Sequence, residues 1–160
     1  MFWAAVSGSA LAVEAGDAAP DFRLDGAGQD VQLAQARGRL VYLDFWASWC
    51  APCKRSFPWM NRLQSRYGAQ GLQVIAVNVD AHHEDALRFL REMPAQFTVA
   101  FDEHGETPRR YRIQGMPTSI LISTAGKVLH VQRGFHPEDE AEIESRIQRT
   151  LADGPSAIKP

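Results

Sequence analysis

The sequence predicts an α/β fold in a single domain, and three features carry this prediction. Residues 40–46 and 72–79 are nearly continuous apolar runs, a composition typical of strands that are covered on both faces of a sheet. Between these runs apolar residues recur at helical spacing, and a hairpin followed by an amphipathic helix closes the chain. A chain of 160 residues is long enough for one domain with a full hydrophobic core.

The first half of the chain begins with a short hairpin. Residues 22–24 and 31–33 alternate between apolar and polar positions around an Asp-Gly-Ala-Gly turn. The helix between the two apolar runs ends at Gly68, and Pro58 inside it predicts a kink. A second helix follows the second run and ends at Pro94, because proline cannot continue a helix.

The second half of the chain predicts shorter elements and a closing helix. The last helix starts at Pro137, with acidic residues early and arginines late, which matches the helix dipole. A Thr-Ala-Gly-Lys turn joins two strands that precede it. The other expected elements are a strand over 97–101, a helix over 106–111, and strands over 119–122 and 128–131.

The overall charge argues against some partner classes. The formal net charge is −2, which gives no electrostatic reason to expect nucleic acid or an anionic membrane surface as a partner. Nothing in the sequence requires more than a monomer. Two cysteines alone do not decide the compartment, because a catalytic pair works in a reducing or an oxidising space.

The N-terminus favours export. No charged residue occurs up to Val13, and residues 10–12 have the small-x-small form of a signal-peptidase site. The basic region of a signal peptide is missing, however, and the apolar run is too short to span a bilayer. We expect a flexible leader over 1–17 (a signal or anchor remnant, or simply a flexible end), a domain over 18–152 and a tail over 153–160. The expected location is periplasmic or otherwise extracytoplasmic.

The two cysteines of the chain, Cys50 and Cys53, are separated by two residues. As a structural staple, a disulfide closing so short a loop would contribute only about 2 kcal/mol. The spacing suits exchange, in which one thiolate attacks a foreign disulfide and its neighbour resolves the mixed intermediate. A zinc site is the alternative, but it needs four ligands, and the sequence has no second Cys pair and no His pair at finger spacing. We therefore expect a redox-active disulfide, with no metal and no other cofactor.

The position of the pair indicates which sulfur attacks. If a strand ends near Trp46 and a helix starts near Cys53, Cys50 lies just ahead of a helix N-terminus. The free amides and the dipole of the helix favour an anion there, so Cys50 should attack and Cys53 should resolve. Lowering a thiol pKa from about 8.5 to about 7 raises the thiolate fraction at pH 7 more than tenfold. Pro52 tightens the loop and removes one competing amide.

Asp44 interrupts a run otherwise suited to a central strand, where an unpaired charged carboxylate would cost several kcal/mol. With a raised pKa it could accept the proton of Cys53; the alternative is a structural Asp bonded to backbone or water. Lys54 either adds positive charge to the site or only solvates the helix surface. Pro117 precedes a strand, a common position that by spacing alone gives only weak support for a functional role.

Taken together, residues 44–54 (Asp-Phe-Trp-Ala-Ser-Trp-Cys-Ala-Pro-Cys-Lys) and 115–118 (Gly-Met-Pro-Thr) resemble the thioredoxin superfamily. Residues 19–24 and the extra segment around 82–97 are similar to its exported TlpA/ResA branch of bacterial thiol-disulfide oxidoreductases. The resemblance covers about residues 18–152. It implies a thioredoxin-like fold, with a central mixed β-sheet flanked by helices and an N-terminal β-hairpin extension.

The resemblance also implies roles for individual residues. Cys50 would be the nucleophile, Cys53 the resolving thiol and Asp44 the buried proton acceptor. Pro117 would be cis and pack against the disulfide, and the backbone of Met116 would pair with an extended substrate segment. The other residues of the implied docking groove are Trp49, Pro52 and Thr118.

The expected function is reduction of disulfides in client proteins outside the cytoplasm, with a membrane thiol electron donor that recharges the enzyme. Many exported relatives carry Asn at position 44 and some cytochrome-maturation members an acid at position 51, so Asp44 and Ala51 make the site resemble ordinary thioredoxin. A disulfide oxidase or isomerase is the alternative within this chemistry, although oxidising members tend to carry a histidine between the cysteines. A non-catalytic binding or chaperone module is disfavoured by the intact pair with Asp44.

Overall fold

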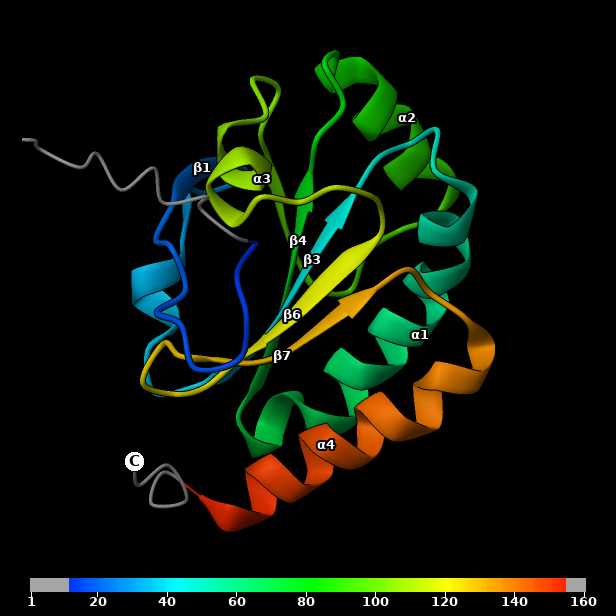
Figure 1. Ribbon diagram of the computed structural model, residues 1–160. Coiled ribbons are helices and arrows are strands. Elements are labelled where there is room, and N and C mark those ends of the chain that lie inside the picture. The colour runs from blue at the N-terminus through cyan, green and yellow to red at the C-terminus, as the bar shows by residue number, and fades with distance from the viewer. Residues whose placement is uncertain (1–11, 155–160) are drawn as a thin grey trace, which may run out of the picture.

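A seven-stranded mixed sheet forms the centre of the protein (Figure 1). The computed structural model describes residues 12–154. The strands are β1 (Arg23–Gly26), β2 (Val31–Gln32), β3 (Leu40–Trp46), β4 (Leu72–Asn78), β5 (Thr98–Phe101), β6 (Thr118–Ile122) and β7 (Val128–Arg133). Their order in the sheet is β2-β1-β5-β4-β3-β6-β7, with β3, β4 and β5 parallel and the outer neighbours antiparallel. The N-terminal hairpin and the α/β class predicted from the sequence are confirmed.

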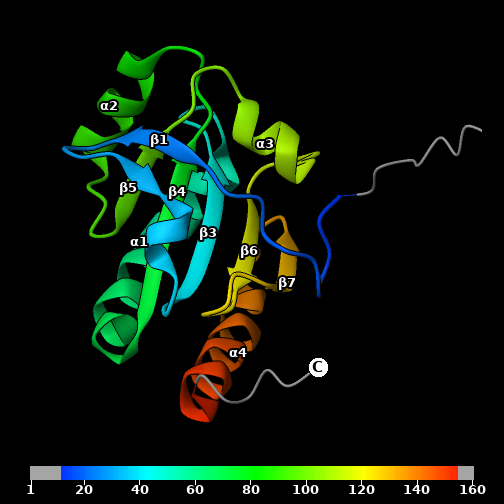
Figure 2. The ribbon, with the colours of Figure 1, turned by 90° about the vertical axis from the view of Figure 1, so that its left-hand side faces the viewer.

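Helices cover both faces of this sheet. They are α1 (Ala51–Tyr67), α2 (His83–Glu92), α3 (Glu106–Tyr111) and α4 (Glu140–Asp153), with 3₁₀ turns η1 (Leu33–Ala36), η2 (Gly68–Gln70) and η3 (Pro137–Asp139). The buried side chains of α1, α2 and α4 form one core with one face of the sheet, and Tyr111 of α3 belongs to the core on the other face. Figure 2, in which β1 lies in front, shows α1 and α3 on opposite sides of the sheet.

The central strand β3 is buried along its whole length, as its composition predicts. Because side chains alternate along a strand, Tyr42 and Trp46 pack on the α1 side, whereas Leu43 and Phe45 pack on the α3 side. Asp44 lies between Tyr42 and Trp46 in this alternation and therefore faces the α1 side. The sheet thus places one carboxyl group beneath the helix that follows the Cys pair.

Aromatic packing holds α1 against the sheet. The centroid of the Phe57 ring lies 4.8 Å from that of Trp46 in β3 and 4.9 Å from that of Phe89 in α2. Both pairs have the edge-to-face geometry that aromatic rings prefer. The ring centroid of Phe97 lies 5.2 Å from that of Phe57. Pro58 follows within α1, and the helix continues through it to Tyr67. This packing fixes the N-terminal half of α1, and with it the Cys pair.

The closing helix starts later than expected. Pro137 opens the 3₁₀ turn η3, and α4 begins only at Glu140. Tighter 3₁₀ turns are frequent at helix termini, and proline suits the first position of either helix type. The acidic residues assigned to the first turn of one helix are therefore divided between η3 and α4.

Part of the predicted leader packs on the domain. Val13 is buried, and the backbone N–H of Gly16 donates to the carbonyl of Val128 at 2.8 Å. The N–H of Val128 donates in turn to the carbonyl of Asp17 at 2.8 Å. The folded part of the chain therefore includes residues 13–17, ahead of the predicted boundary. Residues 1–11 of the leader and 155–160 of the tail lie outside the described residues. Over residues 12–154, no helix is long and apolar enough to cross a membrane.

Candidate active site

Cys50 and Cys53 form a disulfide at the N-terminus of α1. Cys50 is the N-cap residue with an extended backbone, and the N–H of Cys53 points at its Sγ at 3.3 Å. The first turn of α1 contains no acidic residue that would oppose an anion on this sulfur. Cys50 is 5% exposed and Cys53 is 0% exposed, so Cys50 is the less buried of the two cysteines. The expected position of Cys50 just ahead of the helix is confirmed.

A tight turn leads from β3 to this cysteine. The N–H of Cys50 donates to the carbonyl of Ala47 at 3.1 Å, which closes a turn with Ser48 and Trp49 at its centre. Trp49 is 71% exposed, and it is the one exposed large apolar side chain over residues 12–154. Pro52 is half-buried within the first turn of α1, where its missing N–H leaves no helix bond unmade.

A buried carboxylate that sequence reasoning missed holds this turn. Asp80 is 3% exposed, and one of its oxygens accepts from the N–H of Ser48 while the other accepts from the Ser48 hydroxyl, both at 2.9 Å. The side-chain amide of Asn78 donates to Asp80 at 2.7 Å. The available signal was an Asn-Val-Asp sequence at the carboxyl end of a buried strand, where polar side chains need partners.

Asp44 is buried in the sheet and incompletely paired. It is 1% exposed, and the hydroxyl of Ser119 donates to its Oδ1 at 2.7 Å. Its Oδ2 has no hydrogen-bond partner among the described residues. Burial raises the pKa of Asp44 to about 7, and the hydrogen bond from Ser119 opposes this rise. Ser119 was also missed; it lies directly opposite Asp44 in the pairing of β3 with β6.

The loop before β6 carries the remaining residues of the expected groove. The Met116–Pro117 peptide bond is cis, and the carbonyl of Pro117 accepts from the N–H of Gly134 at 2.8 Å. Met116 is half-buried and packs against the core cluster that contains both cysteines. Thr118 pairs with Phe45 in the sheet, and its hydroxyl donates to the carbonyl of Gly115 at 2.7 Å. The structure therefore places the end of this loop beside the end of β3, the strand that leads to the Cys pair.

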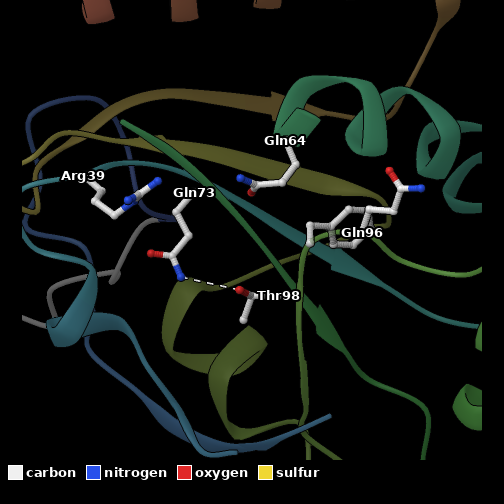
Figure 3. A pocket seen from close by; sticks show the side chains of 6 residues that line it. Arg39, Gln64, Gln73, Gln96 and Thr98 are labelled. Carbon is white, nitrogen blue, oxygen red and sulfur yellow. Dashed lines mark hydrogen bonds between the residues drawn. The ribbon is translucent and has the colours of Figure 1, made fainter. Parts of the chain in front are cut away.

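A polar hollow of about 440 Å³ lies elsewhere (Figure 3). It is lined by Arg39, Gln64, Gln73 and Thr98 among others, and Gln73 donates to Thr98 at 3.5 Å. Gln73 and Thr98 stand near the starts of the parallel strands β4 and β5, whereas the Cys pair follows the end of β3, which runs parallel to them. The hollow is thus at the opposite end of the sheet and takes no part in the site. Over residues 12–154 no group of three or more metal-ligating side chains gathers.

The match to known families agrees with this geometry. Residues 14–147 match the family model described as Redoxin, which spans the sheet, the Cys pair and most of α4. The chain belongs to the Redoxin family. Cys50 and Cys53 are bonded to each other, so in this state neither sulfur is a thiolate that could bind zinc.

Named relatives are similar over most of their length. The chain is 34% identical over 131 residues to the thiol-disulfide oxidoreductase ResA of Bacillus thuringiensis subsp. konkukian, covering 81% of this chain and 76% of the relative. A Chlorobium tepidum crystal structure, assigned as a thiol:disulfide interchange protein DsbE, is 54% identical with a TM-score of 0.85, covering 87% of this chain and 99% of that one. The pneumococcal exposed lipoprotein thioredoxin of Streptococcus pneumoniae is 28% identical with a TM-score of 0.69, covering 84% and 99%.

These similarities confirm the thioredoxin-like fold and the ResA-like family predicted from the sequence. Together with the Cys50–Cys53 disulfide they show an oxidoreductase that works by dithiol–disulfide exchange. Its substrates contain disulfide bonds.

Proposed function

We propose that this Redoxin-family chain reduces disulfide bonds in client proteins, with Cys50 as the attacking thiolate and Cys53 as the resolving thiol. The observation that carries the proposal is the N-cap position of Cys50, whose Sγ faces a helix amide and which is the less buried cysteine. Positive potential at a helix N-terminus stabilises a thiolate, and the thiolate is the nucleophile in exchange.

The reaction proceeds in two balanced exchanges. The Cys50 thiolate attacks one sulfur of the client disulfide, which forms a mixed disulfide and releases one client thiolate. The Cys53 thiolate then attacks the Cys50 sulfur, which forms the internal disulfide and releases the second client sulfur. Two electrons pass from the chain to the client, and a membrane thiol donor returns them by the reverse exchange.

Asp44 accepts the proton that Cys53 loses before the second exchange. It faces α1 from β3, its Oδ2 is free of partners among the described residues, and its pKa of about 7 lets it hold or release a proton at neutral pH. Among the described residues only one of the two buried oxygens of Asp44 accepts a hydrogen bond. This supports a role in proton transfer over a purely structural role.

The client binds across the surface beside Cys50. Trp49 supplies an exposed apolar contact, and an extended client segment pairs with the backbone at Met116, next to cis-Pro117, by strand addition. Pro52 and Thr118 complete the groove. Trp49 is the one exposed large apolar side chain over residues 12–154, which supports this docking role because burying the ring on binding is favourable.

The proposed location is extracytoplasmic, and the proposed state is a monomer. The absence of charge up to Val13 and a relative described as an exposed lipoprotein both support this location. The proposed domain includes residues 13–17, which pack on the sheet, and extends to the end of α4, with the leader before it and the tail after it.

The reduction potential of the Cys50–Cys53 couple tests the direction of transfer. Equilibration against glutathione or dithiothreitol with thiol trapping should give a value near or below about −250 mV, in the thioredoxin range. A value of about −120 to −180 mV would assign the chain to disulfide formation or shuffling instead. Cys53→Ser should accumulate a mixed disulfide with clients. Cys50→Ser should abolish turnover, and retained activity would identify a binding module.

A further inference from the structure

Asp80 lies next to the active-site turn but has no part in the exchange reaction. We propose that Asp80 is a positioning residue that, through Ser48, presents Trp49 to protein clients. The inference rests on the proposed docking role of Trp49 and adds to it the element that sets the specificity for protein over small disulfides.

The contacts of Asp80 form a compact buried network at the ends of two parallel strands. Asp80 follows β4, and both of its carboxylate oxygens are used by Ser48, which follows β3. Asn78 is 1% exposed; it donates its amide to Asp80 at 2.7 Å and accepts the N–H of Asp80 at 3.0 Å. A buried carboxylate with several donors in place is held in one geometry, because losing any donor would leave charge unsolvated.

This network acts on the turn that carries Trp49. Ser48 and Trp49 are the two central residues of the turn closed by Ala47 and Cys50. The backbone N–H of Ser48 is bound by Asp80, so the direction in which the chain enters Trp49 is fixed. An apolar ring that is 71% exposed gains nothing from the fold by standing in water. A ring in this position is available to a partner, and a rigid position lowers the ordering cost when that partner binds.

Cys50 has anchors that do not depend on Asp80. Its carbonyl accepts from the N–H of Lys54 at 3.1 Å, its sulfur faces the N–H of Cys53, and it begins α1. Loss of the Asp80 network should therefore disturb the presentation of Trp49 more than the chemistry at the sulfur. Client selectivity is the property that should change.

The test compares two substrates with five variants. Second-order rate constants of the reduced protein are measured with insulin, a protein disulfide, and with 5,5′-dithiobis(2-nitrobenzoate), a small one. In Asp80→Asn and in Ser48→Ala the ratio of the insulin constant to the small-disulfide constant should fall about tenfold, the effect expected when a charge-assisted hydrogen bond is lost. The double variant should fall no further than Asp80→Asn, because both changes remove the same contact.

Asp102→Asn is the matched control. Asp102 is a buried carboxylate at the end of β5, 5% exposed, and it accepts the N–H groups of Glu106 and Thr107 at the start of α3. It has no bond to the turn of residues 47–50, so this variant should lose stability while its substrate ratio stays at the wild-type value. Urea midpoints identify any variant that is only partly folded. If Asp80→Asn is partly folded, the test rests on Ser48→Ala, which changes a half-buried side chain.

The outcomes separate the two proposals. If Trp49→Ala keeps the wild-type ratio, the docking role of Trp49 is refuted, and this inference with it. If Trp49→Ala lowers the ratio but Asp80→Asn and Ser48→Ala do not, only the positioning role is refuted. An equal fall for both substrates in Asp80→Asn and Ser48→Ala would also refute it, since it would place the effect at the sulfur.

Discussion

Asp44→Asn should make the oxidised protein more stable at alkaline pH and flatten the pH dependence of its unfolding. Burial raises the pKa of Asp44 from 3.8 to about 7, so ionising this carboxyl is less favourable in the folded chain than in the unfolded one. A shift of about three units corresponds to about 4 kcal/mol above pH 7, at 1.36 kcal/mol per unit. The Asn side chain keeps an acceptor for Ser119 and carries no charge.

The sign of the effect follows from the direction of the shift. Below about pH 4 Asp44 is protonated in both states, and its contribution to stability is fully present. As pH rises from about 4 through about 7, the unfolded chain releases the proton more readily, and the contribution of Asp44 is lost by up to about 1.4 kcal/mol per pH unit. The variant has no titrating group at this position, so its stability should not show this loss.

Urea unfolding of the oxidised protein at pH 5, 7 and 9 measures the difference. Two-state unfolding is expected for a single domain of this size with its disulfide intact. Part of this loss has already occurred at pH 5, so the free energy of unfolding of the variant should rise relative to that of the wild type by about 2.7 kcal/mol between pH 5 and pH 9. Asp25→Asn changes an exposed residue of β1 and is the control. Its free energy of unfolding should change with pH in the same way as that of the wild type. If the free energy of unfolding of Asp44→Asn also changed with pH as in the wild type, the reasoning would be refuted, because Asp44 would then have the same pKa in the folded and the unfolded chain.

Three further outcomes are expected. Ser119→Ala removes the one hydrogen bond that stabilises the ionised Asp44 among the described residues, so the pH–rate profile of client reduction should shift to higher pH by about one unit or more. Ser123→Ala changes another buried serine and should leave the profile unchanged. Phe57→Ala should lower the free energy of unfolding by about 3–5 kcal/mol in urea titrations, because the ring is fully buried among three aromatics; a loss below about 1 kcal/mol would show that the site collapses around it. Arg23→Ala breaks an exposed ion pair with Asp30 and should leave the urea midpoint unchanged; a clear shift would contradict the view that such pairs are screened by solvent.

Elements whose local pattern agrees with their environment were predictable from sequence. The run over 40–46 coincides with β3, because a continuous apolar composition specifies burial on both faces. The helix after the Cys pair was expected to end at Gly68, and α1 ends one residue earlier. Cys50 and Cys53 could be predicted from the sequence because two cysteines separated by two residues are suited to disulfide exchange.

Contacts that join distant strands were not predictable in the same way. Ser119 meets Asp44 across 75 residues of chain, and Asp80 meets Ser48 across 32. Strand register depends on the whole sheet, and no single strand records which polar residue will face which. Such a serine has the same sequence pattern as a serine on any strand or turn. The sequence therefore identified the reacting atoms, and only the fold revealed the residues that hold them.

The backbone bonds between residues 16–17 and Val128 have a consequence for solubility. β7 and β2 are the outermost strands, and an outermost strand offers unpaired N–H and C=O groups to which another molecule can add. At Val128 both groups are already occupied by Gly16 and Asp17, and β2 is only two residues long. A chain shortened to begin at residue 20 would uncover Val128 and leave it free to template aggregation. Residues 16–17 thus cover the start of β7.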